Sequence, residues 1–274
     1  MTASKRQAVP RRSTTRTAVQ GLAVAGLVLL AASPASAVTL AEVTDCMRAN
    51  VPETVRVQQV QFVTTDRGRA QRVLTGRLVA SRADGLMRAN LRLDAPPDLK
   101  DAAYLSRETR DGRDEMYLYL PALNRVRRVV GGGRNNTVFG TDFSYNDLRQ
   151  IHDAFYGDQV TLLGEIELAG TPVFHLEVIR EQDDEGAERM QAWVSRDACV
   201  ALQIDLFAGD AVIKRISSPA ASLKQLPAGQ WYADNVRVED RLAESSTDLT
   251  VEDVEVGTEM PERLFNPRSF YLGL

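Results

Sequence analysis

The chain has 274 residues, of which 44% are hydrophobic, and it carries 33 basic against 37 acidic residues for a formal net charge of −4. This acidic balance disfavours nucleic acid as a partner. With two cysteines and two histidines, the chain has few of the residues that metal sites and nucleophile–base pairs use.

Residues 1–37 have the pattern of a cleaved export signal. Five basic residues come first, an apolar run of 12 residues follows at positions 21–32, and Ala35, Ser36 and Ala37 form a small-residue cleavage site. The run is too short to span a bilayer, which requires about 20 apolar residues. We therefore predict cleavage before Val38, a periplasmic location, and a mature chain of residues 38–274 that forms a single domain.

The export route and the charge of the mature chain follow from the same segment. Arg11 and Arg12 resemble a twin-arginine signal, but three hydroxyl residues follow where that signal usually has apolar ones, so general secretion is favoured. Removing residues 1–37 takes away five basic residues and no acidic one. The mature chain then has 28 basic and 37 acidic residues, for a net charge of −9.

Cys46 and Cys199 are the only cysteines. Export permits a disulfide between them, and a bridge over so long a loop stabilises by about 5 kcal/mol in the chain-entropy model. Two buried free thiols are the alternative, and the sequence leaves both open.

Two helices are predicted from their N-terminal residues. Thr39 and Glu42 form a capping box, which predicts a helix that ends near Asn50, before a proline. Ser144 followed by Asp147 predicts a second helix start. This second helix presents an apolar face through Leu148, Ile151 and Phe155.

Most of the remaining chain shows the alternation of β-strands. The clearest case is positions 87–94, where Met87, Ala89, Leu91 and Leu93 alternate with polar residues, which predicts a strand with one solvated face. In residues 55–62 the apolar positions change phase, which predicts a β-bulge at Gln58 and Gln59. Similar alternation with short connections recurs to the C-terminus.

We count about ten strands and two or three helices, without βαβ alternation. The predicted fold class is therefore mainly β: a curved antiparallel open β-barrel, with a few helices covering its apolar concave face. Helices that cover such a face only partly leave an apolar cavity.

The residues with catalytic or metal-binding potential favour a protein that is not an enzyme. Residues 131–134 read Gly-Gly-Gly-Arg but lack the Gly-Lys-Ser/Thr that completes a phosphate-binding loop. Asp142, Asp147, His152 and Asp153 are better explained by turn and helix capping than by a metal site. We therefore expect no catalytic residue, no metal and no cofactor.

Residues 117–148 resemble the outer-membrane lipoprotein-sorting protein family, a branch related to the Lol-type periplasmic carriers. The resemblance is carried by Tyr119-Leu120-Pro121, by residues 125–128, which read Arg-Val-Arg-Arg, by residues 139–145, which read Phe-Gly-Thr-Asp-Phe-Ser-Tyr, with Asp147-Leu148, and by Leu264-Phe265. It implies an open barrel whose apolar interior holds acyl chains of a lipid or lipoprotein. It also implies an association with membrane exporters of the RND type.

We therefore expect a monomeric periplasmic carrier that moves acyl chains toward the outer membrane. The expected lipid-binding residues are Met87, Leu91, Leu93, Leu118, Leu120, Phe139, Phe143, Leu176, Val194, Leu202 and Ile204. The alternative is a regulatory or accessory envelope module without enzymatic activity, which binds a membrane protein partner. In that case the partner contacts Arg125, Arg127 and Arg128, a basic cluster in an acidic protein.

Overall fold

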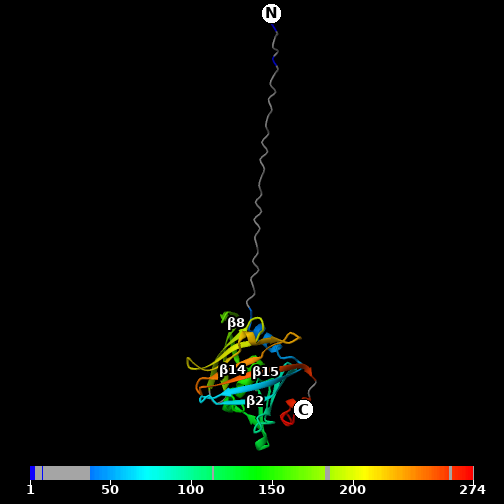
Figure 1. Cartoon of the computed structure of the whole chain (residues 1–274), viewed down its shortest axis with the longest axis vertical. Coiled ribbons are helices and arrows are strands. Elements are labelled where there is room, and N and C mark those ends of the chain that lie inside the picture. Colours follow the sequence, from blue (N-terminus) through cyan, green and yellow to red (C-terminus); the bar gives the residue numbers. More distant parts are fainter. Residues whose placement is uncertain (4–7, 9–37, 113, 183–185, 259–260, 274) are drawn as a thin grey trace. The chain divides into compact units, whose positions relative to one another are not determined.

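The computed structural model describes residues 1–3, 8, 38–112, 114–182, 186–258 and 261–273. Val38–Leu274 forms one compact unit (Figure 1). Among the described residues, no helix is both long enough and apolar enough to cross a membrane.

Fifteen strands make up two antiparallel sheets of the described chain. The large sheet contains β1 (Val55–Thr65), β2 (Gln71–Ala83), β3 (Leu86–Ala95), β4 (Ala103–Arg107), β5 (Glu115–Leu120), β6 (Arg125–Val129), β7 (Gln159–Leu168), β8 (Thr171–Gln182), β9 (Gly186–Ser195), β10 (Ala201–Ala208), β11 (Ala211–Ser217), β14 (Asn235–Asp240) and β15 (Ser245–Thr258). The small sheet pairs β12 (Leu223–Gln225) with β13 (Trp231–Ala233).

The prediction of a mainly β, curved antiparallel fold is confirmed, but the count of about ten strands is wrong. Some strands lack the alternation on which the count depends. Strand β4 is buried at four of its five positions, because both of its faces are covered. Strands β12 and β13 have only three residues each, too few to show a period.

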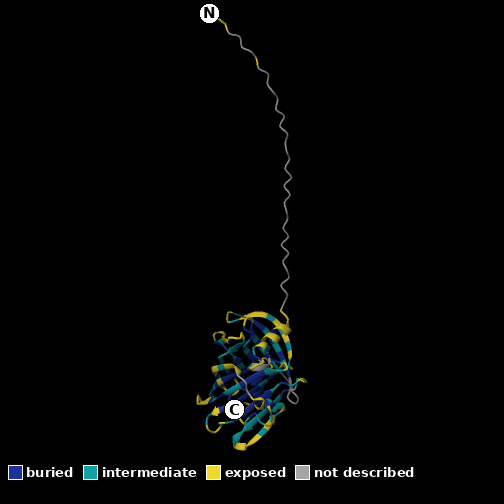
Figure 2. Ribbon diagram, turned by 90° about the vertical axis from the view of Figure 1, so that its right-hand side faces the viewer, coloured by how far each residue is buried: buried dark blue, intermediate teal, exposed yellow. Residues whose placement is uncertain are grey.

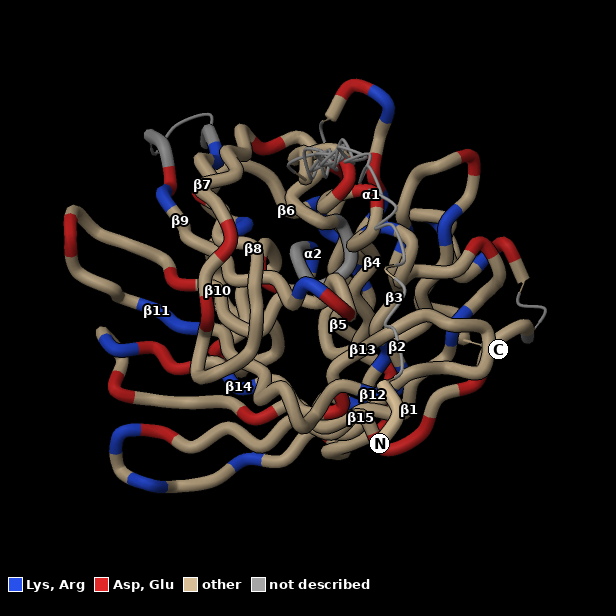
Figure 3. Tube along the Cα trace, turned by 90° about the horizontal axis from the view of Figure 1, so that it is seen from above, with Lys and Arg blue, Asp and Glu red and all other residues tan. Residues whose placement is uncertain are grey.

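The strand order explains how the sheet encloses a space. The order is β6-β5-β4-β3-β2-β1-β15-β14-β11-β10-β9-β8-β7, so β1 and β15 join two meanders, and β6 and β7 lie at opposite edges. No ladder joins β6 to β7 among the described strands, and the sheet stays open. Seen from above, the strands curve around a helix (Figure 3). The chain between the two edges carries that helix.

In the described part of the chain, two α-helices and four short 3₁₀ helices accompany the sheets. They are α1 (Leu40–Ala49), α2 (Tyr145–Asp153), η1 (Pro121–Leu123), η2 (Gly131–Asn135), η3 (Ala220–Ser222) and η4 (Glu262–Phe265). Both predicted N-caps are confirmed, because Thr39 with Glu42 and Ser144 with Asp147 form capping boxes. The side chain of Ile151 lies outside the described residues, whereas Leu148 and Phe155 are buried in the core.

The main core fills the concave side of the large sheet (Figure 2). The segment before α2 contributes to it, since Phe143 is fully buried and packs edge-on against Phe62 of β1, with ring centroids 5.8 Å apart. Asp142 fixes this segment to β15. One of its carboxylate oxygens accepts a hydrogen bond from the hydroxyl of Thr247 (2.7 Å), and the other oxygen accepts one from the hydroxyl of Ser245.

The opposite face of β1–β5 is also buried, which corrects the prediction of a solvated face on β3. A second core there joins Val55 and Val57 to Phe265 and Phe270 of the C-terminal segment. Asn90, on the polar side of β3, is 3% exposed and donates to the carbonyls of Leu264 (2.6 Å) and Phe270 (2.9 Å).

Burial on both faces also explains the phase change in β1. Val55 and Val57 face the C-terminal segment, whereas Val60 and Phe62 face the main core. The prediction of a bulge in β1 at Gln58 and Gln59 is wrong, because β1 pairs with β2 without a break. The pairing of β1 with β15 has two register shifts, but the extra residues, Glu252 and Gly257, belong to β15.

Phe270→Ala tests whether the C-terminal segment contributes to stability. The side chain is fully buried, so its removal leaves a cavity and we expect a loss of about 3–5 kcal/mol, measured by urea unfolding. Leu272→Ala is the control, because that side chain is 60% exposed and its loss should change little. Equal stability of the two variants would show that the segment is dispensable.

Candidate functional site

An apolar cavity of about 110 Å³ lies on the concave side, under α1 and β13. Its floor is the middle of the large sheet, and its main apolar residues are Met47, Val60, Ile204, Ile216, Val236 and Leu249. The floor residues belong to the main core, which places the cavity on the concave side of the sheet. Two helices and a two-stranded sheet are too small to fill a surface this wide.

Strand register brings the floor residues together. Ile204 of β10 is paired with Ile216 of β11, and Val236 of β14 with Leu249 of β15, so neighbouring strands present apolar side chains to the same face. A register shift between Ala201 and Gln203 leaves Leu202 unpaired with β9. Because of this shift, Ala201 and not Leu202 lines the cavity.

The cover of the cavity is held at the end of α1. A disulfide joins Cys46 of α1 to Cys199, with Cα atoms 5.7 Å apart. Asn50, the C-cap of α1, donates from Nδ2 to the carbonyls of Ala198 (2.8 Å) and Cys199 (3.2 Å). Its Oδ1 accepts from the backbone amide of Trp231 in β13 (2.8 Å). One residue therefore links both parts of the cover.

One buried cation lies in this apolar lining. Arg56 of β1 is 4% exposed and donates from Nη1 to the backbone carbonyl of Asn50 (3.1 Å). Burial lowers the pKa of its guanidinium to about 10, an effect that the nearby Tyr232 partly opposes. The equally buried Gln58 lies beside it in the lining.

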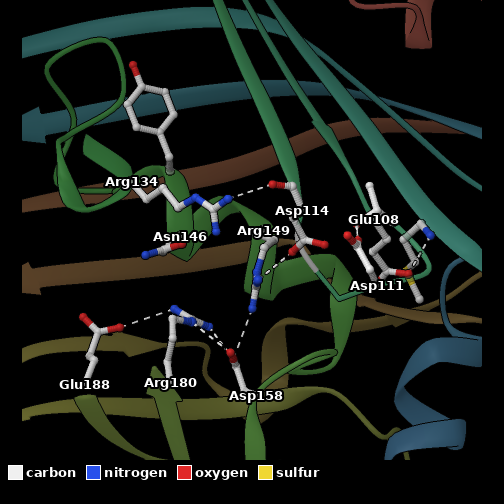
Figure 4. A network of polar contacts seen from close by, with 12 residues as sticks. Glu108, Asp111, Asp114, Arg134, Asn146, Arg149, Asp158, Arg180 and Glu188 are labelled. Carbon is white, nitrogen blue, oxygen red and sulfur yellow. Dashed lines mark hydrogen bonds and ion pairs between the residues drawn. The ribbon is translucent and has the colours of Figure 1, made fainter. Parts of the chain in front are cut away.

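A set of charged side chains positions α2, whose C-cap Ala154 also lines the cavity. Arg149 of α2 donates to Asp114 (2.5 Å) and Asp158 (3.1 Å), and Arg180 of β8 donates to Asp158 (2.6 Å) and Glu188 (3.3 Å) (Figure 4). We call these five residues the α2 network. They connect the helix to elements near both edges of the open sheet.

Burial opposes the ionised form of two carboxyls in the α2 network. It raises the pKa of Asp114 despite the attraction of Arg149, and it raises the pKa of Glu188 despite the attraction of Arg180. At the other end of α2, Lys214 of β11 donates to Asp147 (3.0 Å), which also caps the helix.

The predicted lipid-binding residues are mostly buried together, but away from the cavity. The main core contains Leu91, Leu93, Phe139, Phe143, Leu176, Val194 and Ile204, with Leu118 and Leu120 half-buried against it. Met87 lies in a separate small cluster, and Leu202 is buried at the register shift. Ile204 is the member of the predicted set that lines the cavity. As lipid contacts, all eleven remain a prediction.

The other candidates from the sequence have structural partners or lie apart. The His175 ring stacks on Trp193, with centroids 4.8 Å apart. Gly131, Gly132 and Gly133 belong to η2. The side chains of His152 and Asp153 lie outside the described residues. Within the described part of the chain, no group of three or more His, Cys, Asp or Glu residues is arranged to hold a metal ion.

The predicted partner-binding arginines lie together on an edge strand. Arg125, Arg127 and Arg128 are exposed on β6. Nη2 of Arg128 lies 3.7 Å from Oε1 of Glu115 in the neighbouring strand β5. No other described strand pairs with the outer edge of β6. The exposed Leu123 and Val130 flank the strand in sequence.

A protein-family model described as "Uncharacterized protein" matches residues 86–271. No curated protein is significantly similar in sequence. Solved structures that share the fold include the following three. A Vibrio parahaemolyticus domain named for outer membrane lipoprotein sorting has a TM-score of 0.73 at 21% identity, covering 84% of this chain and 97% of its own. A DUF1329 family protein from Desulfovibrio piger has a TM-score of 0.72 at 20% identity, and the match covers 82% of this chain and 95% of that protein.

The third structure is a LolA superfamily protein from Nitrosomonas europaea, with a TM-score of 0.63 at 15% identity, covering 84% of this chain and 98% of its own. The predicted resemblance to lipoprotein-sorting proteins is therefore confirmed for the fold.

Asp114→Asn tests the electrostatics of the α2 network. Because burial raises the pKa of Asp114 above its ordinary 3.8, the folded state holds this proton more tightly than the unfolded state. Its contribution to stability therefore increases as pH falls from the raised pKa toward 3.8, and the asparagine variant lacks this increase. We therefore expect the Tm of the wild type, minus the Tm of Asp114→Asn, to increase as pH falls. Thermal unfolding of both proteins across that pH range measures this difference.

Glu262→Gln is the control with the opposite sign. Its hydrogen bond to Arg88 lowers the pKa of Glu262, so the stability that this group contributes is present above the ordinary 4.5 and is lost as pH falls through the lowered value. A Tm difference for Asp114→Asn that does not change with pH would contradict this assignment.

Proposed function

We propose that this chain, which belongs to the family of uncharacterized proteins whose model matches residues 86–271, is a periplasmic carrier of acyl chains. The observation that supports this most directly is the covered apolar cavity on the concave face of a lipoprotein-sorting fold. The cargo is a lipid or the acyl part of a lipoprotein. The protein acts by binding and release, without a chemical step.

The energetics of transport favour such a cavity. Each CH₂ group exposed to water costs about 0.8 kcal/mol, so an acyl chain crosses an aqueous compartment only when most of it is covered. A cavity of 110 Å³ has the volume of about four water molecules, which is room for the end of a chain. The cover must therefore move to admit the rest.

One part of the cover, β13, is not paired with the large sheet. It pairs with β12 instead. Its described link to α1 is the hydrogen bond from Trp231 to Asn50, and Arg56 reaches the carbonyl of that same Asn50. Breaking these hydrogen bonds would separate β13 from α1 and from Arg56. Asp234, which follows β13, would still accept from the backbone amide of Val251 in β15 (2.8 Å), and the disulfide would keep α1 attached near Cys199.

The proposed location rests on the export pattern of residues 1–37, which lie largely outside the described residues. The disulfide between Cys46 and Cys199 supports it, because such bonds persist in oxidising compartments like the periplasm. We propose that the mature domain begins at Val38, that it works as a monomer, and that it delivers cargo toward the outer membrane.

We further propose that Arg125, Arg127 and Arg128 on β6 contact the membrane protein with which the carrier exchanges cargo, an exporter of the RND type. An exposed cluster of positive charge on a mainly acidic chain favours an acidic partner surface. If the protein is instead a regulatory module, this strand is its main functional surface.

Charge reversal of Arg125 and Arg127 separates these two functions. We expect Arg125→Glu with Arg127→Glu to weaken capture of the membrane partner, measured by crosslinking in cells, while acyl-probe binding stays unchanged. Reversal of Arg67 and Arg69, in the connection between β1 and β2, is the control. A variant that loses acyl binding and keeps its partner would contradict the assignment of β6.

Ala201→Phe tests the cavity directly. The half-buried Ala201 lines the cavity floor, so the larger side chain occupies the space of several CH₂ groups and should weaken binding of a fluorescent acyl probe about tenfold or more. Ala208→Phe is the matched control, since it makes the same change at an exposed position of the same strand. Unchanged probe binding in a folded Ala201→Phe variant would place the acyl site elsewhere.

A further inference from the structure

Arg56 differs from the other deeply buried arginines in its partners. Arg149 and Arg180 both form ion pairs with buried carboxylates of the α2 network. Among the described residues, no carboxylate forms an ion pair with Arg56, and the hydrogen bond to the carbonyl of Asn50 uses a neutral acceptor. Its Nε is buried and has no hydrogen-bond partner.

This arrangement is energetically unfavourable without a ligand. A buried charge requires a counter-charge or full hydrogen bonding to offset its desolvation, and Arg56 has neither. The lowered pKa of its guanidinium has the same cause, because burial disfavours the charged form. The guanidinium has five N–H donors, so Nε remains available after Nη1 has bonded to Asn50.

The surroundings of Arg56 suggest which ligand would supply the missing charge. It lies in the lining of a cavity whose remaining surface is mainly apolar, with Val60, Ile216 and Leu249 among its residues. A ligand that fits both parts has an apolar chain and one anionic group. The anion accepts from Nε and from a second guanidinium N–H, a charge-assisted geometry that neutral groups do not match.

We propose that the cavity selects acyl chains that end in an anionic group, a carboxylate or a phosphate, and that Arg56 binds this group. The inference rests on the proposed carrier function and narrows it to anionic amphiphiles.

The test compares ligands of equal chain length that differ in the headgroup. Lauric acid, dodecyl phosphate and dodecanol are titrated against the disulfide-bonded mature protein at about pH 8, where the carboxylate is ionised, by displacement of a fluorescent acyl probe. We expect the wild type to bind at least one of the two anionic ligands about tenfold more tightly than dodecanol. The stronger of the two anions distinguishes a carboxylate from a phosphate site.

Arg56→Met should abolish this preference while dodecanol binding persists, because methionine keeps the apolar contacts and removes the charge. Arg56→Lys should retain part of the preference. Arg92→Met is the matched control: Arg92 also has a buried Nε without a partner, but it pairs with Asp101 and does not line the cavity, so the preference should remain.

Each outcome decides one of the two proposals. If the wild type binds the three ligands equally, the role of Arg56 is wrong and the carrier function stands. If the wild type binds none of them, the carrier function itself is contradicted. If Arg56→Met keeps the preference for the anion, another group recognises the headgroup and the inference fails. The comparison of ligands on the wild type holds even if Arg56→Met is unstable.

Discussion

The structure depends on burying both faces of a very wide antiparallel sheet. Its two edge strands, β6 and β7, follow one another in the sequence, so their connection has to cross the concave side. This connection brings Phe143 and α2 into the interior, and the C-terminal segment covers the other face of β1–β5. The cavity is the part of the concave face that α1, α2 and β13 cover without filling.

Polar interactions distinguish two regions of this interior. Around α2 the buried charges are paired, and the helix is fixed to strands near both edges of the sheet. In the lining of the cavity the buried Arg56 is not paired with an acid among the described residues, and Asn50 links β13 to the end of α1, which the disulfide and an ion pair from Arg48 to Glu108 also hold. β13 has fewer such contacts than α1, so under the proposed carrier function β13 is the part of the cover that moves.

Local patterns predicted much of the fold. Both capping boxes, the hairpin spacings and the mainly β class depend on neighbouring residues, and these predictions are confirmed. The two-sided burial of β1 and β3 escaped prediction, because the covering residues come from the distant C-terminus. Alternation alone could not show that the polar side of β3, with Asn90, lies under that segment.

The functional site was less predictable for the same reason. Period-2 alternation identified apolar faces but not which part of the concave face the helices leave unfilled, so Ile204 alone among the predicted residues lines the cavity. A register shift at Leu202 moved the lining to Ala201. Arg56 gave no signal, because an arginine in a strand resembles a solvent-facing residue until the cover above it is known.

The central claim is that the cavity under α1 and β13 holds an acyl chain. Native mass spectrometry of the protein, isolated from the periplasm of its own host without detergent, tests this most directly. We predict an added mass that corresponds to one acyl-bearing amphiphile on the wild type, reduced or absent in Ala201→Phe and retained in Ala208→Phe. Wild-type protein that carries no bound amphiphile and acquires none from added lipid vesicles would contradict the account.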